Sequence, residues 1–237
     1  MPMQIAVLPD AAEVASRAAA IIAEHARVAV QARGRFLIAV SGGHTPWVML
    51  HELAKEDVPW QGVHVFQVDE RIAPAGDPDR NLTHLRETLL QHAPIDPSHI
   101  HAMPVENPDS QAAAAGYART LEDLAGSPPV LDLVHLGLGP DGHTASLVPN
   151  DPVLQVMDRD VAVTEVYMGR QRMTLTYPVI NRARHILWVV TGAEKVKALS
   201  QLQKGDTSIP GGRISRDQAL VLADQAAADV GDPTPAA

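Results

Sequence analysis

Short apolar segments alternate with stretches of helical pattern along most of the chain, and no other feature constrains the fold as strongly. Phe36–Val40, Val63–Val68, Leu131–Leu136 and Ile186–Val190 are apolar at most positions, and glycine or polar residues follow each of them. Segments of this length and composition are typical of strands that are covered on both faces, as in a parallel sheet. The stretches between them are long enough for the helices that connect parallel strands.

The helical stretches carry their own start and stop signals. Asp10, with Glu13 three residues later, forms a capping box before an alanine-rich helix, and Gly34 suits the end of that helix. Pro46 suits the first turn of the next helix. Further strands are expected at Ile5–Leu8, Ile100–Met103, Val161–Val166, Met173–Tyr177 and Ala219–Leu222, and further helices at 82–90, 109–124 and 193–203 and after the last strand. The pattern predicts an α/β protein with a Rossmann-like open, mainly parallel sheet and helices on both faces.

Composition limits both the organisation and the chemistry of the chain. It has 237 residues, 46% of them hydrophobic, and no repeat, low-complexity linker or change of composition divides it. We therefore expect residues 1–237 to form a single α/β domain with a frayed tail at 231–237. Cysteine is absent, which excludes disulfides, thiolate metal sites, iron–sulfur clusters and a cysteine nucleophile.

The formal net charge of −9 bears on possible partners. So acidic a chain argues against nucleic acid or an anionic membrane as a partner, although a local site can still attract a small anion. The N-terminus lacks the pattern of a signal peptide, and no apolar run reaches 18 residues. We expect a cytoplasmic protein that binds a small molecule and is a monomer or a small homo-oligomer.

Four of the expected strands end in sequences suited to ligand binding, at 41–45, 69–71, 137–143 and 191–195. In an open α/β sheet the ligand binds beyond the carboxyl ends of the strands. Because these ends lie along one edge of a parallel sheet, the four loops are expected to meet. The sequence therefore predicts one binding site built from segments far apart in the chain.

The loop at 41–45 has the design of a phosphate cradle. Gly42 and Gly43 let the backbone approach a ligand closely, and Ser41 and Thr45 add hydroxyl groups beside the N-terminus of the following helix. The loop lacks the GxxxxGK[ST] pattern, so it does not indicate a nucleoside triphosphate. A plain tight turn is the alternative interpretation.

The loop at 137–143 matches the pattern GxGxxG, but its context argues against a dinucleotide site. It lies past the middle of the chain, and Pro149 and Pro152 leave no room for the helix that the motif needs. Asp141 and His143 in this loop are instead candidate catalytic residues. The pKa of a histidine suits proton transfer near neutral pH, and a neighbouring carboxylate can fix the histidine tautomer.

Charged residues near the other strand ends complete the candidate site. Asp69 and Arg71 follow the strand at 63–68, where a salt-bridged strand terminus is the alternative interpretation. Arg170 or Arg172 can clamp a phosphate or a carboxylate with two parallel hydrogen bonds. Lys195 stands near a helix N-terminus, where the helix dipole disfavours a cation; a bound anion resolves that conflict, and so does solvent exposure.

These segments, in this order, resemble the 6-phosphogluconolactonase family, which is related to the glucosamine-6-phosphate deaminases and isomerases. The resemblance runs from residue 4 to about residue 224, and the stretch DGHTASL at 141–147 is its most specific part. The Glu-containing run that follows Asp-Gly-His in the deaminases is absent here. The matching segments are SGGHTP at 41–46, DER at 69–71, NLTHLRETLL at 81–90, GLGPDGHTASLVP at 137–149, RMTLT at 172–176 and TGAEK at 191–195.

The resemblance implies hydrolysis of 6-phospho-D-glucono-1,5-lactone to 6-phosphogluconate in the oxidative pentose phosphate pathway, with no cofactor and no metal. His143 would be the general base, Asp141 would orient it, and Arg71 would stabilise the oxyanion or a substrate hydroxyl group beside Asp69. The residues implied to bind the substrate or its phosphate are Ser41, Gly42, Gly43, Thr45, Asn81, Arg172 and Lys195.

Two positions depart from the family pattern. Arg80 stands where family members often have Ser, and it is a candidate for changing the rim of the site; Val148 stands where they often have Phe, a change of packing. Two alternative functions stay open from the sequence. One is a sugar-phosphate isomerase or deaminase of the same fold, and the other is a non-catalytic sugar-phosphate-binding protein.

Overall fold

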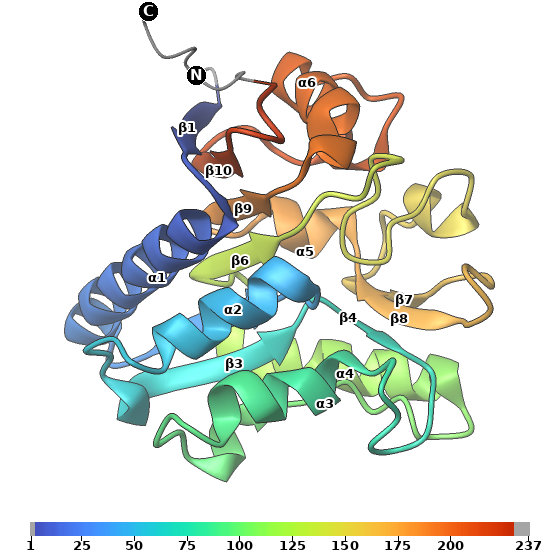
Figure 1. The fold of residues 1–237 in the computed structure, drawn as a ribbon. Coiled ribbons are helices and arrows are strands. Elements are labelled where there is room, and N and C mark those ends of the chain that lie inside the picture. The colour runs from blue at the N-terminus through green and yellow to red at the C-terminus, as the bar shows by residue number, and fades with distance from the viewer. Residues whose placement is uncertain (1–2, 230–237) are drawn as a thin grey trace, which may run out of the picture.

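A seven-stranded sheet forms the centre of the computed structural model, which describes residues 3–229 (Figure 1). Its strand order is β1-β10-β9-β6-β2-β3-β5, and every pairing in it is parallel. This confirms the predicted open parallel sheet. The strands are β1 (Gln4–Leu8), β2 (Phe36–Val40), β3 (Val63–Gln67), β5 (Ile100–His101), β6 (Leu133–Leu136), β9 (Ile186–Val190) and β10 (Ala219–Asp224).

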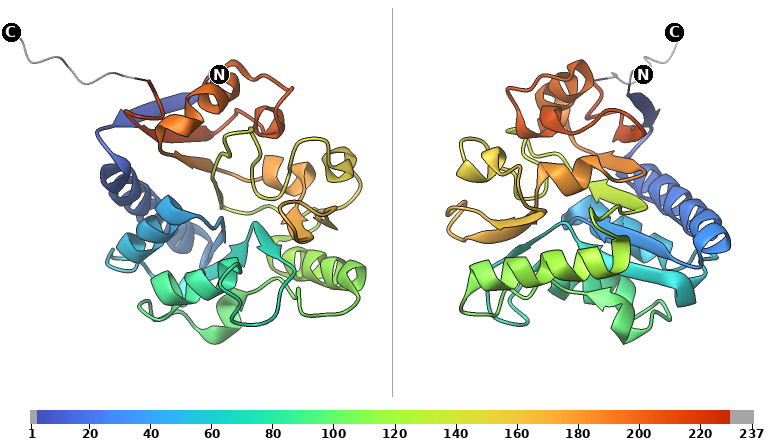
Figure 2. Two further views of the ribbon diagram at one scale, coloured as in Figure 1. Left: turned by 45° about the vertical axis from the view of Figure 1, so that its right-hand side comes forward. Right: turned by 180° about the vertical axis from the view of Figure 1, so that it is seen from behind.

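Helices cover both faces of this sheet, as expected. Figure 1 shows α1 and α2 in front of the sheet, and the view from behind in Figure 2 brings α4 to the front. Side chains alternate along β2: Phe36 and Ile38 pack in the core beneath α1 and α2, whereas Leu37 and Ala39 pack with α4. The helices are α1 (Ala11–Arg33), α2 (His44–Leu53), α3 (Asn81–Leu85), α4 (Ser110–Ala125), α5 (Tyr177–Asn181) and α6 (Val196–Lys204).

Helix α1 begins and ends where its capping residues predict. The Asp10 carboxylate accepts hydrogen bonds from the N–H groups of Ala12 and Glu13, both at 2.9 Å. Gly34 ends the helix in the left-handed conformation, with φ of 73°. A side chain at that φ would be strained, so the glycine sets the turn into β2.

A second, three-stranded sheet was not predicted. Strands β4 (Asp69–Arg71), β8 (Arg172–Leu175) and β7 (Val161–Val163) pair antiparallel in that order. The strands expected at 161–166 and 173–177 are present in shortened form, and they belong to this separate antiparallel sheet. The connection between β7 and β8 is too short for a crossover, and a short connection makes neighbouring strands antiparallel.

Two smaller expectations also differ from the structure. The helix expected after the last strand is a series of turns at 225–229, within the described residues. The helix expected at 82–90 is divided into α3 and a π-helical segment, Arg86–Leu90. The expected tail at 231–237 lies outside the described residues. No helix in residues 3–229 is both long and apolar enough to cross a membrane.

The strand order places a switch point between β2 and β6. From β2 the chain proceeds outward to β3 and β5 on one side, and it then continues with β6 and β9 on the other side. The loops that leave β2 and β6 therefore diverge and open a crevice above the carboxyl ends of these strands. The four predicted loop segments, at 41–45, 69–71, 137–143 and 191–195, follow β2, β3, β6 and β9 in turn. These four strands are neighbours in the sheet.

A histidine cluster lies outside this crevice and links stability to pH. The His64 and His99 rings stack with centroids 3.9 Å apart, and His64 Nδ1 lies 3.1 Å from His101 Nε2. Burial, followed by the nearby charges of His99 and His101, lowers the pKa of His64 to about 4. The unfolded chain therefore binds a proton at this residue more readily, so acidification from about pH 6.5 to pH 4 favours unfolding.

We expect the melting temperature to fall over this pH range and the fall to be smaller in the His64→Gln variant. Thermal melts at a series of pH values measure both. His92→Gln is the matched control, because the His92 side chain is exposed; its Nε2 lies 2.9 Å from the Glu87 carbonyl oxygen, and its ring meets the His51 ring edge to face. An equal change of melting temperature with pH in the parent and in His64→Gln would contradict this linkage.

Candidate active site

A cleft of about 320 Å³ lies at the carboxyl ends of β2, β3, β6 and β9. Its volume is in the range of small-molecule sites. Among the described residues it brings together every predicted site residue except Asp141. The predicted residues that line it are Ser41, Gly42, Gly43, Thr45, Asp69, Arg71, Asn81, His143, Arg172 and Lys195.

His143 lies on one wall of the cleft with Asp141 behind it. Asp141 Oδ1 lies 2.6 Å from His143 Nδ1 and accepts a second hydrogen bond from the His143 backbone N–H at 3.1 Å. A carboxylate at Nδ1 favours the tautomer with a proton on that nitrogen, which leaves the lone pair on Nε2. Burial alone would raise the pKa of Asp141, but the hydrogen bonds from His143 and Tyr167 and the charge of His143 lower it overall. Asp141 therefore stays ionised and holds the ring.

The loop 137–143 requires glycine where it passes beneath the imidazole. A Cβ on Gly139 would overlap His143 Nδ1. The Gly139 N–H donates to the His143 carbonyl at 2.8 Å, which folds the loop back on itself. No described helix lies between residues 137 and 151, so the GxGxxG pattern does not open a helix here, as predicted.

Asp69, Asn81 and Arg71 form a second wall of the cleft. Asn81 Nδ2 donates to Asp69 Oδ1 at 3.2 Å, and Asn81 Oδ1 accepts from Arg71 Nη1 at 2.8 Å. The Ser146 hydroxyl donates to Asp69 Oδ2 at 2.6 Å. Ser146 belongs to the same loop as His143, so this bond fixes one wall against the other. A Cβ on Gly42 would overlap Asn81 Oδ1, which explains the glycine at that position.

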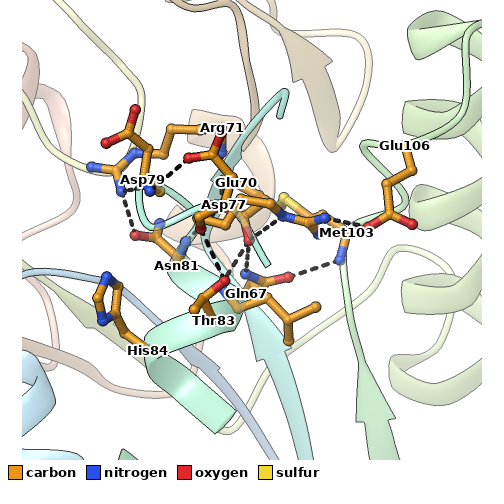
Figure 3. Close-up of polar contacts among 12 residues, drawn as sticks. Gln67, Glu70, Arg71, Asp77, Asp79, Asn81, Thr83, His84, Met103 and Glu106 are labelled. Atoms are coloured by element: carbon orange, nitrogen blue, oxygen red, sulfur yellow. Dashed lines mark hydrogen bonds and ion pairs between the residues drawn. The ribbon is translucent and has the colours of Figure 1, made fainter. Parts of the chain in front are cut away.

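Glu70 supports this wall from beneath, and Figure 3 shows its carboxylate among the polar groups of β4 and α3. Oε1 accepts from the N–H groups of Arg71 and Asn81, both at 2.8 Å. Oε2 accepts from Leu82 N–H at 2.8 Å and from Gln67 Nε2 at 2.9 Å. Glu70 is completely buried, so its carboxylate joins β4 to the start of α3 and positions both cleft residues.

The phosphate-cradle loop follows β2 at the switch point. The Ser41 hydroxyl donates to the His135 carbonyl at 2.9 Å, and the Ser41 N–H donates to His135 Nδ1 at 3.2 Å. Both donors of Ser41 are thus engaged with β6. Thr45 Oγ1 lies 2.6 Å from Thr191 Oγ1, which ties the loop to the end of β9. The N–H groups of the first turn of α2 need acceptors from outside the helix, as a phosphate cradle requires.

Two arginines in the cleft carry a buried donor without an acceptor among the described residues. These donors are Arg71 Nε and Arg172 Nε. Burial, together with the charge of Arg71, lowers the pKa of Arg172, although Asp69 opposes this shift. The positive charge of two guanidinium groups in the lining of one cleft favours an anionic ligand.

Arg170 does not line the cleft. Its Nε donates to Asp79 Oδ2 at 2.9 Å and its Nη2 donates to Asp77 Oδ2 at 3.0 Å. Of the two candidate arginines, Arg172 is therefore the one placed to meet a ligand. Lys195 lies at the start of α6, as predicted, and its Nζ is 3.6 Å from Glu194 Oε1.

Arg80 is not at the rim of the site, contrary to the expectation. Its side chain is buried, pairs with Glu106, and lies 3.5 Å from Glu70 Oε2. An arginine here stabilises the buried carboxylate beneath the cleft rather than a substrate at its edge. Val148 is buried, as expected of a packing change.

Sequence reasoning missed Glu70, Ser146 and Tyr167 as parts of the site. Residues i and i+2 of a strand share a face, so a strand at 69–71 would have placed Asp69 and Arg71 together and Glu70 opposite them. The Tyr167 hydroxyl donates to Asp141 Oδ2 at 3.0 Å. Nothing in the sequence around Tyr167 indicates this contact, because it depends on how the β7–β8 hairpin packs. No group of three or more His, Asp or Glu residues in 3–229 is arranged to hold a metal ion.

The fold and the cleft define an α/β protein with a site for an anionic small molecule, and comparisons with known proteins identify its family. The family model described as glucosamine-6-phosphate isomerases/6-phosphogluconolactonase matches residues 9–222. A 6-phosphogluconolactonase from Nostoc sp. is 38% identical over 206 residues, which cover 85% of each chain. The solved 6-phosphogluconolactonase from Trypanosoma cruzi has a TM-score of 0.86 at 27% identity, and the match covers 96% of each chain. The chain belongs to this family.

A monomeric glucosamine-6-phosphate deaminase is also similar in structure. Its TM-score is 0.84, but its sequence identity is 19%, so the likeness shows a shared fold alone. Relatives with higher sequence identity include the 6-phosphogluconolactonase from Mycobacterium tuberculosis, which is 34% identical over 242 residues.

Proposed function

We propose that this protein hydrolyses 6-phospho-D-glucono-1,5-lactone to 6-phosphogluconate, the step that the resemblance assigns to the oxidative pentose phosphate pathway. The observation that carries the proposal is the cleft itself. His143, with Asp141 hydrogen-bonded behind it, lines this cleft together with the cationic side chains of Arg71 and Arg172. Family membership and the 6-phosphogluconolactonase relatives support the same activity.

Lactone hydrolysis needs a base for water and a positive group for the developing oxyanion. In our proposal His143 Nε2 takes a proton from water as the water oxygen bonds to the lactone carbonyl carbon. Arg71, held by Asn81 at 2.8 Å, stabilises the negative charge that forms on the carbonyl oxygen, and Asp69 positions that wall. The intermediate collapses by breaking the bond to the ring oxygen, which receives the proton from His143, and the new acid ionises.

The phosphate of the substrate needs an anchor away from the reacting carbon. We assign this to Gly42, Gly43, Thr45, Arg172 and Lys195, with Asn81 as a further contact. Ser41 supports the loop, because its hydroxyl and its N–H are bonded to His135. Holding the phosphate fixes the lactone carbonyl near His143, and such positioning accelerates a reaction by removing the entropy cost from the chemical step.

A parallel assay separates this proposal from its main alternative. The protein is incubated with 6-phosphogluconolactone in one series and with glucosamine 6-phosphate in another, while lactone loss and ammonia release are followed. We expect lactone loss above the spontaneous rate and no ammonia. Ammonia release would favour a deaminase, and binding of sugar phosphates without turnover would favour a non-catalytic binding protein.

Replacing Arg172 tests the phosphate anchor. A hydrogen bond to a charged group contributes about 1.5–3 kcal/mol, so we expect Arg172→Gln to lower kcat/KM for the phosphorylated lactone by about 10- to 100-fold. Hydrolysis of unphosphorylated glucono-1,5-lactone should change little. Arg159→Gln is the matched control, because Arg159 is exposed and pairs with Asp158. Equal losses on the two lactones would contradict the assignment.

The reaction as proposed requires a small-molecule substrate and no cofactor, metal or nucleic acid. We propose that residues 1–237 act as a single domain, as a monomer or a small homo-oligomer. We also propose the cytoplasm as the compartment, because a phosphorylated lactone is charged and does not cross a membrane unaided.

A further inference from the structure

Tyr167 touches three functional groups of the cleft, although it lies on the hairpin between β7 and β8. Its hydroxyl donates to Asp141 Oδ2 at 3.0 Å. Its ring meets the His143 ring edge to face, with centroids 5.7 Å apart at 64°. The Arg172 guanidinium carbon lies 5.0 Å from the centre of the same ring. One half-buried side chain thus contacts Asp141 and His143, and it also contacts Arg172, the proposed phosphate anchor.

The two oxygens of Asp141 are divided between two partners. Oδ1 is hydrogen-bonded to His143, and Oδ2 accepts a hydrogen bond from the Tyr167 hydroxyl. Without a donor at Oδ2, the carboxylate could rotate and leave His143 Nδ1. Burial and the hydrogen bond to Asp141 raise the pKa of Tyr167, so its hydroxyl remains a donor over the working pH range.

The hairpin is itself held in place. Tyr167 and Arg170 are paired through two backbone hydrogen bonds, at 3.0 and 3.3 Å. Arg170 forms ion pairs with Asp77 and Asp79, which lie in the loop after β4. The Asp79 carbonyl oxygen also accepts from Arg71 Nη1 at 2.7 Å. The turn that carries Tyr167 is therefore tied to the same loop that holds Arg71.

We propose that Tyr167 is a positioning residue: its hydroxyl fixes Asp141, and through it the His143 tautomer and orientation, while its ring forms a platform for Arg172. The inference rests on the proposed lactonase function. It gives the two parts of one side chain different roles. The hydroxyl affects the chemical step through Asp141 and His143, and the ring affects substrate binding through Arg172.

The two tasks predict different kinetic effects for two variants. Tyr167→Phe keeps the ring and removes the hydroxyl, so we expect kcat to fall about 5- to 20-fold with KM nearly unchanged. Tyr167→Leu removes both, so we expect a similar fall in kcat and a rise in KM of about 3-fold or more. Phosphogluconolactone hydrolysis is measured with the spontaneous rate subtracted.

A matched control and a double variant separate positioning from general stability. Tyr177→Phe removes a hydroxyl that donates to the Pro210 carbonyl at 3.1 Å, outside the cleft, and should leave kcat unchanged. In an Asp141→Ala background, Tyr167→Phe should have no further effect, because the group through which it acts is gone.

Three results would overturn the assignment: parental kcat in Tyr167→Phe, an undiminished effect in the Asp141→Ala background, or an equal loss in Tyr177→Phe. A parent with no hydrolysis above the blank would instead overturn the proposed function. An active parent with an equally active Tyr167→Phe variant would overturn the role of Tyr167 alone.

Discussion

Replacing His143 by alanine is expected to lower kcat for lactone hydrolysis by about 10²–10⁴-fold, the usual contribution of a positioned general base. The variant removes the imidazole ring, whose Nδ1 lies 2.6 Å from Asp141 Oδ1 and whose Nε2 is proposed to take the proton from the attacking water. Stopped-flow or NMR time courses with the spontaneous hydrolysis subtracted give kcat directly. We expect KM to change little, because the phosphate anchors are intact.

Two controls make this result specific. His92→Ala removes an exposed histidine outside the cleft and should retain parental kcat. Thermal melts should show that His143→Ala remains folded, because the side chain is partly exposed and its removal creates no closed cavity. A folded His143→Ala variant with near-parental kcat would exclude His143 as the base.

Replacing Glu70 by glutamine is expected to destabilise the protein by about 3 kcal/mol or more and to lower its melting temperature by about 6–12 °C. Each carboxylate oxygen of Glu70 accepts two hydrogen bonds in the buried interior. An amide group of the same shape turns one acceptor into a donor that faces other donors, and it removes the charge beside Arg80. Urea unfolding and thermal melts measure the loss.

The same variant should also lose activity. Glu70 orders the backbone of Arg71 and Asn81, so both residues lose their positions in the cleft when the carboxylate is replaced. Glu24→Gln is the control for stability: its ion pair with Arg27 is largely exposed, and its loss should cost less than about 1 kcal/mol. Equal melting temperatures of the parent and Glu70→Gln would contradict the role of Glu70.

The sequence predicted the parallel sheet and the position of the site because both depend on local signals. Continuous apolar runs such as Phe36–Val40 indicate strands buried on both faces, and parallel strands bring their carboxyl ends to one edge. Glycine-rich loops at these ends indicated where a ligand approaches the backbone. The cleft lining confirms that these segments meet in space.

The small antiparallel sheet and the supporting residues could not be predicted in this way. Strand β4 is three residues long and wholly polar or charged, so no apolar pattern marks it. The contacts of Tyr167 and Ser146 join segments 26 and 77 residues apart in the chain. Such contacts depend on tertiary packing, which overrides local pattern. Ser41 was predicted to offer its hydroxyl to the ligand, but that hydroxyl donates to the His135 carbonyl instead.

The most direct test of the central claim is a time course of freshly generated 6-phosphoglucono-1,5-lactone with the purified protein, in the presence and absence of a chelator. We predict loss of the lactone well above the spontaneous rate, formation of 6-phosphogluconate with release of one proton per turnover, and no effect of the chelator. Loss of the lactone at the rate of the blank would contradict the proposed function. Activity that disappears with the chelator would contradict the metal-free, histidine-based mechanism.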